Sequence, residues 1–343
     1  MSAPSAIHRA DVFCKRLHLR NFTVFDDTEF NFIGPGINVF VGENGTGKTH
    51  AMKVIYAWML SQTFSGAIDA GFHKTLLRTM QAEEEQDLVS EFSKSSEISI
   101  EYGAVSWKTL VNAEGIHAQR LIQGIERPVF IQAIEMISHA KGFGDIYDTY
   151  ELEFDWTVRD IVRLLGVRSR SPAPLYQKII RQIEDTALKG SVEYEAKEDR
   201  YFLVQNGSRS SMPMVAEGLR KIATLHALLM NGSVKAGTTL FWDEPEMNLN
   251  PVLMDELVSA LVQIARTGVQ IILATHSYIL LEELRDACKP SEVRYFGFEA
   301  AAGRTTVTST DELPLLTPNP ILRQYESLYN RQMARVVQEN PAE

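Results

Sequence analysis

The stretch "INVFVGENGTGKTH", residues 37–50, decides the fold of this chain. It begins with a continuous apolar run ending in glycine, which is typical of a buried parallel strand as it enters a phosphate-binding loop. Five of its residues fill the pattern G-x-x-x-x-G-K-[ST], namely Gly42, Gly45, Gly47, Lys48 and Thr49. Residues 48–64 then show helical periodicity. The order strand, glycine loop and helix predicts that the loop binds the phosphates of a nucleotide.

The chemistry of the loop suggests a role for each part of it. Glycines allow the backbone N–H groups to point inward at phosphate oxygens. We expect Lys48 to reach the β- and γ-phosphates and the hydroxyl of Thr49 to be a ligand of Mg²⁺. The residues predicted to contact the nucleotide are Gly42, Glu43, Asn44, Gly45, Thr46, Gly47, Lys48 and Thr49.

Two acids follow a second apolar run, "TTLFWDEPE", residues 238–246. Asp243 would hold Mg²⁺ through its water shell, and Glu244 would polarise the water that attacks the γ-phosphate. Adjacent acids are also common on protein surfaces. Their place after a buried strand, in a chain that carries the phosphate loop, favours the catalytic interpretation.

A histidine follows the next predicted strand, in "VQIILATHS", residues 269–277. A lone histidine at a strand end is more often structural than catalytic. Because parallel strands bind ligands at their carboxyl ends, His276 is expected to contact the γ-phosphate or the attacking water. The candidate catalytic residues are therefore Glu244 and His276.

The rest of the chain predicts an α/β fold in several parts. Residues 12–25 and 26–33 are typical of paired antiparallel strands, whereas strands and helices alternate after residue 213, which indicates a mostly parallel sheet. Between them lie helical segments and hairpins at 97–111 and 191–205. The predicted divisions are 1–64 (N-terminal lobe), 65–205 (inserted helical and β subdomain), 206–290 (C-terminal lobe) and 291–343 (C-terminal extension).

Composition narrows the class of protein. The chain has 343 residues, of which 45% are hydrophobic and 23% charged, as in ordinary globular proteins. Cys14 and Cys288 lie far apart, which supports neither a disulfide framework nor a cysteine zinc site. The N-terminus lacks a signal-peptide pattern, and no run approaches the roughly 20 apolar residues of a membrane span. We expect a cytoplasmic protein without a membrane partner.

The net charge of the chain argues against nucleic-acid binding, whereas one local segment is compatible with it. The formal net charge of −10 argues mildly against DNA binding over the whole surface. Residues 158–182 are locally basic, with Asp160 as the acid among Arg159, Arg163, Arg168, Arg170, Lys178 and Arg181. This segment is either a surface for a nucleic acid or acidic partner, or an ordinary solvated helical face.

The motifs and their order resemble the ABC-type ATPases of the RecF, SMC and OLD group. The resemblance rests on "LRNFTVFDDTEFNF", "INVFVGENGTGKTH", "AEGLRK", "LFWDEPEMNLNP" and "ILATHS", and is strongest for the small AAA-15/AAA-21-type ATPases of bacterial defence and toxin–antitoxin loci. It implies a P-loop ATPase head with an inserted, mainly helical subdomain, and ATP and Mg²⁺ as cofactors. It further implies a nucleotide sandwiched between two head-to-tail protomers.

The segment that corresponds to the ABC signature departs from the family pattern. In "VAEGLRK" (215–221), Ala216 replaces the usual serine and Glu217 the first glycine, whereas Gly218 is kept as a candidate nucleotide contact. The helix N-terminus, Arg220 or Lys221 would then donate to the partner's γ-phosphate. Asn250 replaces the aspartate of transporters, and Gln132 is a candidate for the glutamine loop.

Two functions from different classes are compatible with these features. One is a regulatory ATPase that forms a homo-oligomer and controls a separate effector, such as a nuclease or toxin, in bacterial defence. The other is a RecF-like ATPase that clamps DNA for repair; structural ATP binding with little turnover is a third alternative. No nuclease motif is recognisable. The compact insertion and acidic charge favour the regulatory ATPase.

Overall fold

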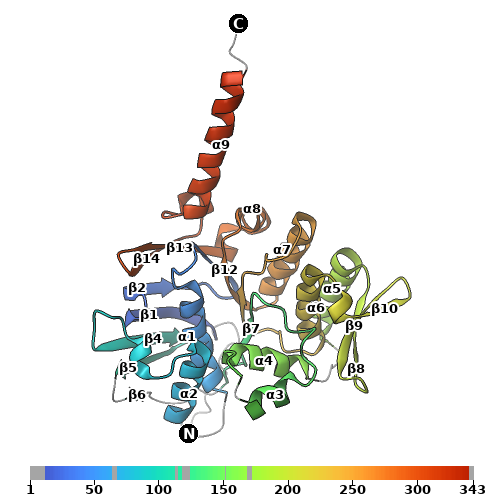
Figure 1. The fold of residues 1–343 in the computed structure, drawn as a ribbon, viewed down its shortest axis with the longest axis horizontal. Helices are drawn as coiled ribbons and strands as arrows, with labels where there is room; N and C mark the ends of the chain where they lie inside the picture. The colour runs from blue at the N-terminus through green and yellow to red at the C-terminus, as the bar shows by residue number, and fades with distance from the viewer. Residues whose placement is uncertain are drawn as a thin grey trace, which may run out of the picture.

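The computed structural model describes residues 12–63, 68–112, 115–117, 124–150, 152–167 and 172–339. Within these residues, eleven strands form one large sheet in the order β6-β5-β4-β1-β2-β14-β13-β3-β12-β11-β7. Helices flank this sheet, and a small second sheet lies at the edge of the molecule (Figure 1). The expected α/β fold class is confirmed.

The parallel half of the large sheet carries the phosphate loop. Its neighbouring strands all run parallel. They are β13 (Val293–Ala301), β3 (Gly36–Gly42), β12 (Gln270–Thr275), β11 (Thr239–Asp243) and β7 (Val129–Ile131). Every residue of β3 and β12 is buried, because helices or other chain segments cover both faces of a parallel sheet.

The other half of the sheet is antiparallel. It comprises β1 (Cys14–Phe22), β2 (Phe25–Asn31), β4 (Ser95–Tyr102), β5 (Val105–Asn112) and β6 (Gly115–His117). β14 (Arg304–Thr310) pairs antiparallel with β13 and joins β2 through Thr305 and Phe25, so the two halves form one continuous sheet. β4 alternates half-exposed and buried residues, as a half-buried strand does.

The helices form layers on the two faces of the sheet. They are α1 (Lys48–Ser61), α2 (Ile68–Met80), α3 (Phe143–Tyr150), α4 (Trp156–Leu165), α5 (Pro174–Gln182), α6 (Glu217–Met230), α7 (Pro251–Arg266), α8 (Tyr278–Ala287) and α9 (Pro320–Glu339). Alternate residues of β3 point to opposite faces of the sheet and pack in two different hydrophobic cores. Val39 and Val41 pack in the core with α4 to α8, and Phe40 packs in the core with α1 and the antiparallel strands. The phosphate loop is thereby anchored from both faces.

Residues 65–205 contribute to several parts of the molecule. Strands β4 to β7 complete the large sheet, whereas α4 lies beside α6, α5 lies beside α6 and α7, and α3 packs on α4. The small antiparallel sheet consists of β8 (Ser191–Glu195), β9 (Arg200–Gln205) and β10 (Ser208–Ser211). The division of the chain into four parts stays a prediction.

Helix α9 projects away from the body of the molecule (Figure 1). In the described part of the chain, none of the helices combines the length and apolarity that crossing a membrane requires.

Candidate functional site

The phosphate loop runs from the end of β3 to the start of α1. Gly45 and Gly47 have φ angles of 76° and 87°, which favour glycine. A Cβ on Gly47 would lie 2.6 Å from Val24, and one on Gly42 would lie 2.8 Å from the carbonyl oxygen of Phe298. Close packing of the loop against β2 and β13 therefore requires these glycines.

The tip of the loop is exposed and its base is buried. Glu43, Asn44 and Gly45 are exposed, whereas Thr46 is buried and its hydroxyl donates to the carbonyl of Glu43 at 2.8 Å. The buried Lys48 ammonium donates to the carbonyl oxygens of Gly42 and Glu43 at 2.8 and 2.7 Å. Burial lowers the pKa of Lys48, although nearby carboxylates oppose that shift.

Thr49 and Asp243 meet across the site although they lie 194 positions apart in sequence. The Thr49 hydroxyl donates to Oδ2 of Asp243 at 2.8 Å. Burial raises the pKa of Asp243, and the Thr49 hydrogen bond opposes that shift. A hydroxyl beside one carboxylate fits Mg²⁺, which in nucleotide sites uses one or two carboxylates and takes its other ligands from phosphates and water.

Glu244 has an uncommon backbone conformation directly after β11. Its φ is 48°, in the left-handed region, where a non-glycine residue is strained. Its N–H donates to the carbonyl of Ala274 at 3.0 Å, and the buried Lys221 ammonium donates to its carbonyl at 3.1 Å. These two hydrogen bonds hold the backbone so that the Glu244 side chain lies near His276.

His276 lies next to Glu244, as expected for parallel strands. Its Nδ1 is 3.4 Å from Oε1 of Glu244, and the two side chains are 45% and 25% exposed. Its backbone N–H donates to Glu246 at 3.1 Å, and the same carboxylate oxygen accepts from the Thr275 hydroxyl at 2.6 Å. Glu246 was not among the predicted site residues, although its position two residues after Glu244 was a signal available in the sequence.

Gly218 lies in the first turn of α6 and is buried within its own chain. A Cβ at this position would lie 2.6 Å from the carbonyl oxygen of Asn248, so the close approach of these two segments accounts for the glycine. Arg220 binds Glu135 at 3.0 Å and Lys221 binds Glu244. Both cations considered as donors to a partner's phosphate thus have partners in the same chain. Asn250 caps α7 by accepting from Leu253.

Gln132 follows β7, the strand that pairs with β11. Its side-chain amide donates to both oxygens of Asp155 at 2.8 Å. Lys53 on α1 also binds Asp155, at 2.9 Å. Gln132 is therefore connected through one carboxylate to the helix that follows the phosphate loop.

The basic segment is only partly described, because Arg168 and Arg170 lie outside the described residues. Arg159 pairs with Asp148, and the buried Asp160 accepts from Arg127 and from the Tyr56 hydroxyl. Arg163, Lys178 and Arg181 are exposed and form no ion pair with any described residue. Arg163 lies on α4, and Lys178 and Arg181 lie on α5.

The described residues hold no cluster of three His, Cys, Asp or Glu side chains that could bind a metal ion. A magnesium site at Thr49 and Asp243 needs no such cluster, since bound phosphates and water supply the other ligands.

Two family models match the chain. Residues 159–282 match "AAA domain, putative AbiEii toxin, Type IV TA system", and residues 16–110 match an AAA domain model. The first match contains α6, Asp243, Glu244 and His276, and the second contains the phosphate loop.

Similar solved structures are heads of SMC proteins. An SMC head bound to the C-winged helix domain of ScpA has a TM-score of 0.57 and 13% identity, over 87% of this chain and 97% of that one. A second structure is an SMC head with an extended coiled coil, bound to the C-terminal domain of ScpA and derived from Pyrococcus furiosus. It has a TM-score of 0.54 and 12% identity, and the match covers 92% of this chain and 99% of that one. The SMC head domain from Thermotoga maritima has a TM-score of 0.51 and 16% sequence identity, and the match covers 86% of this chain and 98% of that one. The solved structures thus show that this chain has the fold of an SMC-type ATPase head, and the two family models match AAA domains over two parts of it.

Proposed function

We propose that this chain binds ATP with Mg²⁺ and hydrolyses it at the site formed by the phosphate loop and the ends of β11 and β12. The observation that carries the proposal is the 2.8 Å hydrogen bond between Thr49 and Asp243. It brings the expected metal ligands together beside Lys48 and Glu244. Bound Mg²⁺ would neutralise charge on the phosphate oxygens.

Other residues of the chain bind the phosphates and activate the attacking water. The backbone N–H groups of the loop and Lys48 bind the phosphates. The Glu244 carboxylate accepts a proton from the attacking water, and His276 orients that water or contacts the γ-phosphate. Glu246 positions His276 through the backbone hydrogen bond at 3.1 Å.

A second copy of the chain would complete this site. The Glu244 and His276 side chains are 25% and 45% exposed, so one copy leaves the reacting groups open to water. Closing an active site against solvent strengthens its electrostatic interactions. We therefore propose that ATP joins two protomers head to tail, and that opening and closing controls a separate effector protein. The ScpA domains bound to two of the similar SMC heads support a separate protein partner.

The oligomeric state in the presence of ATP tests this proposal. Glu244→Gln should let ATP bind without turnover, so light scattering after size-exclusion chromatography should show a dimer with ATP and a monomer without it. Glu326→Gln, an exposed control on α9, should not accumulate such a dimer. A Glu244→Gln chain that stays monomeric at saturating ATP would contradict the head-to-tail arrangement.

A second candidate function is DNA clamping, favoured by the exposed cations on α4 and α5 that form no ion pair with the described residues. Binding of duplex DNA in the presence of ATP should then weaken steeply with salt, since each phosphate contact releases counterions. Replacing Arg163, Lys178 and Arg181 together by Gln should reduce the salt slope by about 3. DNA affinity that does not depend on these three residues would remove this candidate.

A further inference from the structure

A cavity of about 350 Å³ lies outside the proposed ATPase site, between the small sheet and the segment that follows β7. Four parts of the chain line it: residues 137–141, the end of α4 at residues 162–166, the hairpin of β8 and β9 through Tyr194 and residues 199–201, and Met212–Pro213, which lie shortly before the signature-like segment. Its volume falls within the range of sites that bind small molecules.

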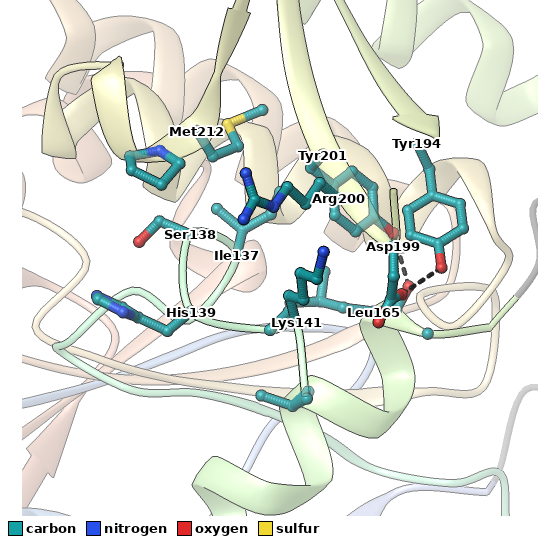
Figure 2. A pocket seen from close by; sticks show the side chains of 14 residues that line it. Ile137, Ser138, His139, Lys141, Leu165, Tyr194, Asp199, Arg200, Tyr201 and Met212 are labelled. Atoms are coloured by element: carbon teal, nitrogen blue, oxygen red, sulfur yellow. Dashed lines mark hydrogen bonds between the residues drawn. The ribbon is translucent and has the colours of Figure 1, made fainter. Parts of the chain in front are cut away.

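Two cations face this cavity. Figure 2 shows the Lys141 ammonium and the Arg200 guanidinium reaching into the same hollow from opposite walls. Neither cation has a carboxylate partner within ion-pair distance among the described residues. Asp199 also lines the cavity, where its carboxylate accepts a hydrogen bond from the Tyr194 hydroxyl at 2.5 Å, so two cations face one carboxylate and the charge of the lining is net positive. The cavity is therefore suited to an anion.

One wall of the cavity is aromatic. The rings of Tyr194 and Tyr201 lie 5.1 Å apart, and Tyr194 is 40% exposed. The Tyr201 hydroxyl donates to the carbonyl of Leu165 at 2.6 Å, which fixes that ring. A ligand with a flat ring can stack on a tyrosine ring, and a phosphate on the same ligand can bind the neighbouring cations.

A chain of contacts connects the cavity to Glu244. Ser138 lines the cavity and donates to Glu135 through both its hydroxyl and its N–H, the latter at 3.1 Å. The same buried carboxylate binds Arg220 on α6 at 3.0 Å. The next residue, Lys221, donates to the Glu244 carbonyl at 3.1 Å. A ligand that shifts the wall at residues 137–141 can thereby change how α6 holds Glu244.

We propose that this cavity binds a nucleoside monophosphate, with its phosphate on Lys141 and Arg200 and its base against the tyrosines, and that binding changes the rate of ATP hydrolysis. The regulatory part rests on the proposed ATPase function. The binding part does not depend on it.

Calorimetric titration of guanosine 5′-monophosphate into the full chain, saturated with a non-hydrolysable ATP analogue, tests the binding. We expect one site per chain, at least 10-fold weaker binding by Lys141→Gln or Arg200→Gln, and unchanged binding by Lys197→Gln, an exposed control on the same hairpin. Absence of binding by guanosine, adenosine, cytidine and uridine monophosphates would overturn the proposal. Equal affinity of the Arg200→Gln and unsubstituted chains for guanosine 5′-monophosphate would also overturn it. Binding of a 5′-phosphorylated oligonucleotide in place of the mononucleotides would do the same.

ATPase assays with the same monophosphate test the coupling. At saturating monophosphate, Ser138→Ala should lose at least half of the effect of the monophosphate on the ATPase rate. A full effect in Ser138→Ala would overturn the proposed route through Glu135. Binding without any change in the ATPase rate would overturn the regulation, and a chain without ATPase activity that still binds the monophosphate would overturn the proposed function while the binding site stands.

Discussion

At the scale of single residues, the site depends on groups that the fold holds in unfavourable states. Glu244 has φ 48°, the Lys48 and Lys221 ammonium groups are buried, and burial raises the pKa of Asp243. Each of these features costs free energy in the folded chain. They lie together at the carboxyl ends of the parallel strands, where such cost is typical of a functional site.

Asp243→Asn is expected to separate stability from function. Because burial raises the pKa of Asp243, the charge of this carboxylate is a cost to the folded chain, so the neutral amide should not lower the melting temperature without nucleotide and Mg²⁺ at pH 7, and we expect a small rise. ATP hydrolysis should fall by at least 100-fold. Thermal melts in a chelator, paired with ATPase assays, test both effects. A clear loss of stability would mean that the ionised carboxylate stabilises the fold.

Lys221→Met is expected to impair hydrolysis while the fold is kept. Methionine fills the space of the buried lysine stem but cannot donate to the Glu244 carbonyl, so Glu244 should be misplaced and kcat should fall by about 10- to 100-fold. Steady-state ATPase assays with circular dichroism measure this; Lys235→Met, on an exposed lysine, is the control. Unchanged kcat would show that Lys221 does not position Glu244.

At the scale of elements, local sequence patterns predicted the features whose residues are close together in sequence. The phosphate loop was predictable because its pattern is contiguous, and the hairpin of β4 and β5 because its strands are close in sequence. The pairing of β4 with β1 was not predictable, since it joins segments about 80 residues apart. The contact of Gly218 with Asn248 and the role of Glu246 likewise depend on tertiary packing.

Helix α9 is an element whose apolar residues remain exposed. Leu328, Tyr329 and Met333 are 42%, 61% and 44% exposed, whereas Tyr325 stacks on Tyr278 with ring centroids 4.5 Å apart. The described part of the outer helix therefore contributes little to the core.

Ending the chain after Ser327 should change the melting temperature by less than about 3 °C. Ending it after Asn319 should cost at least about 1 kcal/mol more, because the Tyr278–Tyr325 contact and the packing of Ile321 against the core are both lost. Calorimetry of the two truncated chains tests this. A loss above about 10 °C for the shorter truncation would mean that the outer part of α9 supports the fold.

At the scale of the whole molecule, one continuous sheet connects every part of the proposed ATPase site. β3 brings the phosphate loop, β11 brings Asp243 and Glu244, and β12 brings His276, so three adjacent strands deliver groups that lie far apart in sequence. The sequence order of the motifs predicted this convergence. The strand order needed the structure, because β12 lies between β3, which leads into the phosphate loop, and β11, which ends at Asp243.

The central claim is that this arrangement hydrolyses ATP with Glu244 as the base. A single-turnover assay with radiolabelled ATP and Mg²⁺ tests it most directly, by comparing the unsubstituted chain with Glu244→Gln. The account predicts that Glu244→Gln retains ATP with at least the affinity of the unsubstituted chain and releases phosphate at least 100-fold more slowly. Equal rates of phosphate release in the two chains would contradict it.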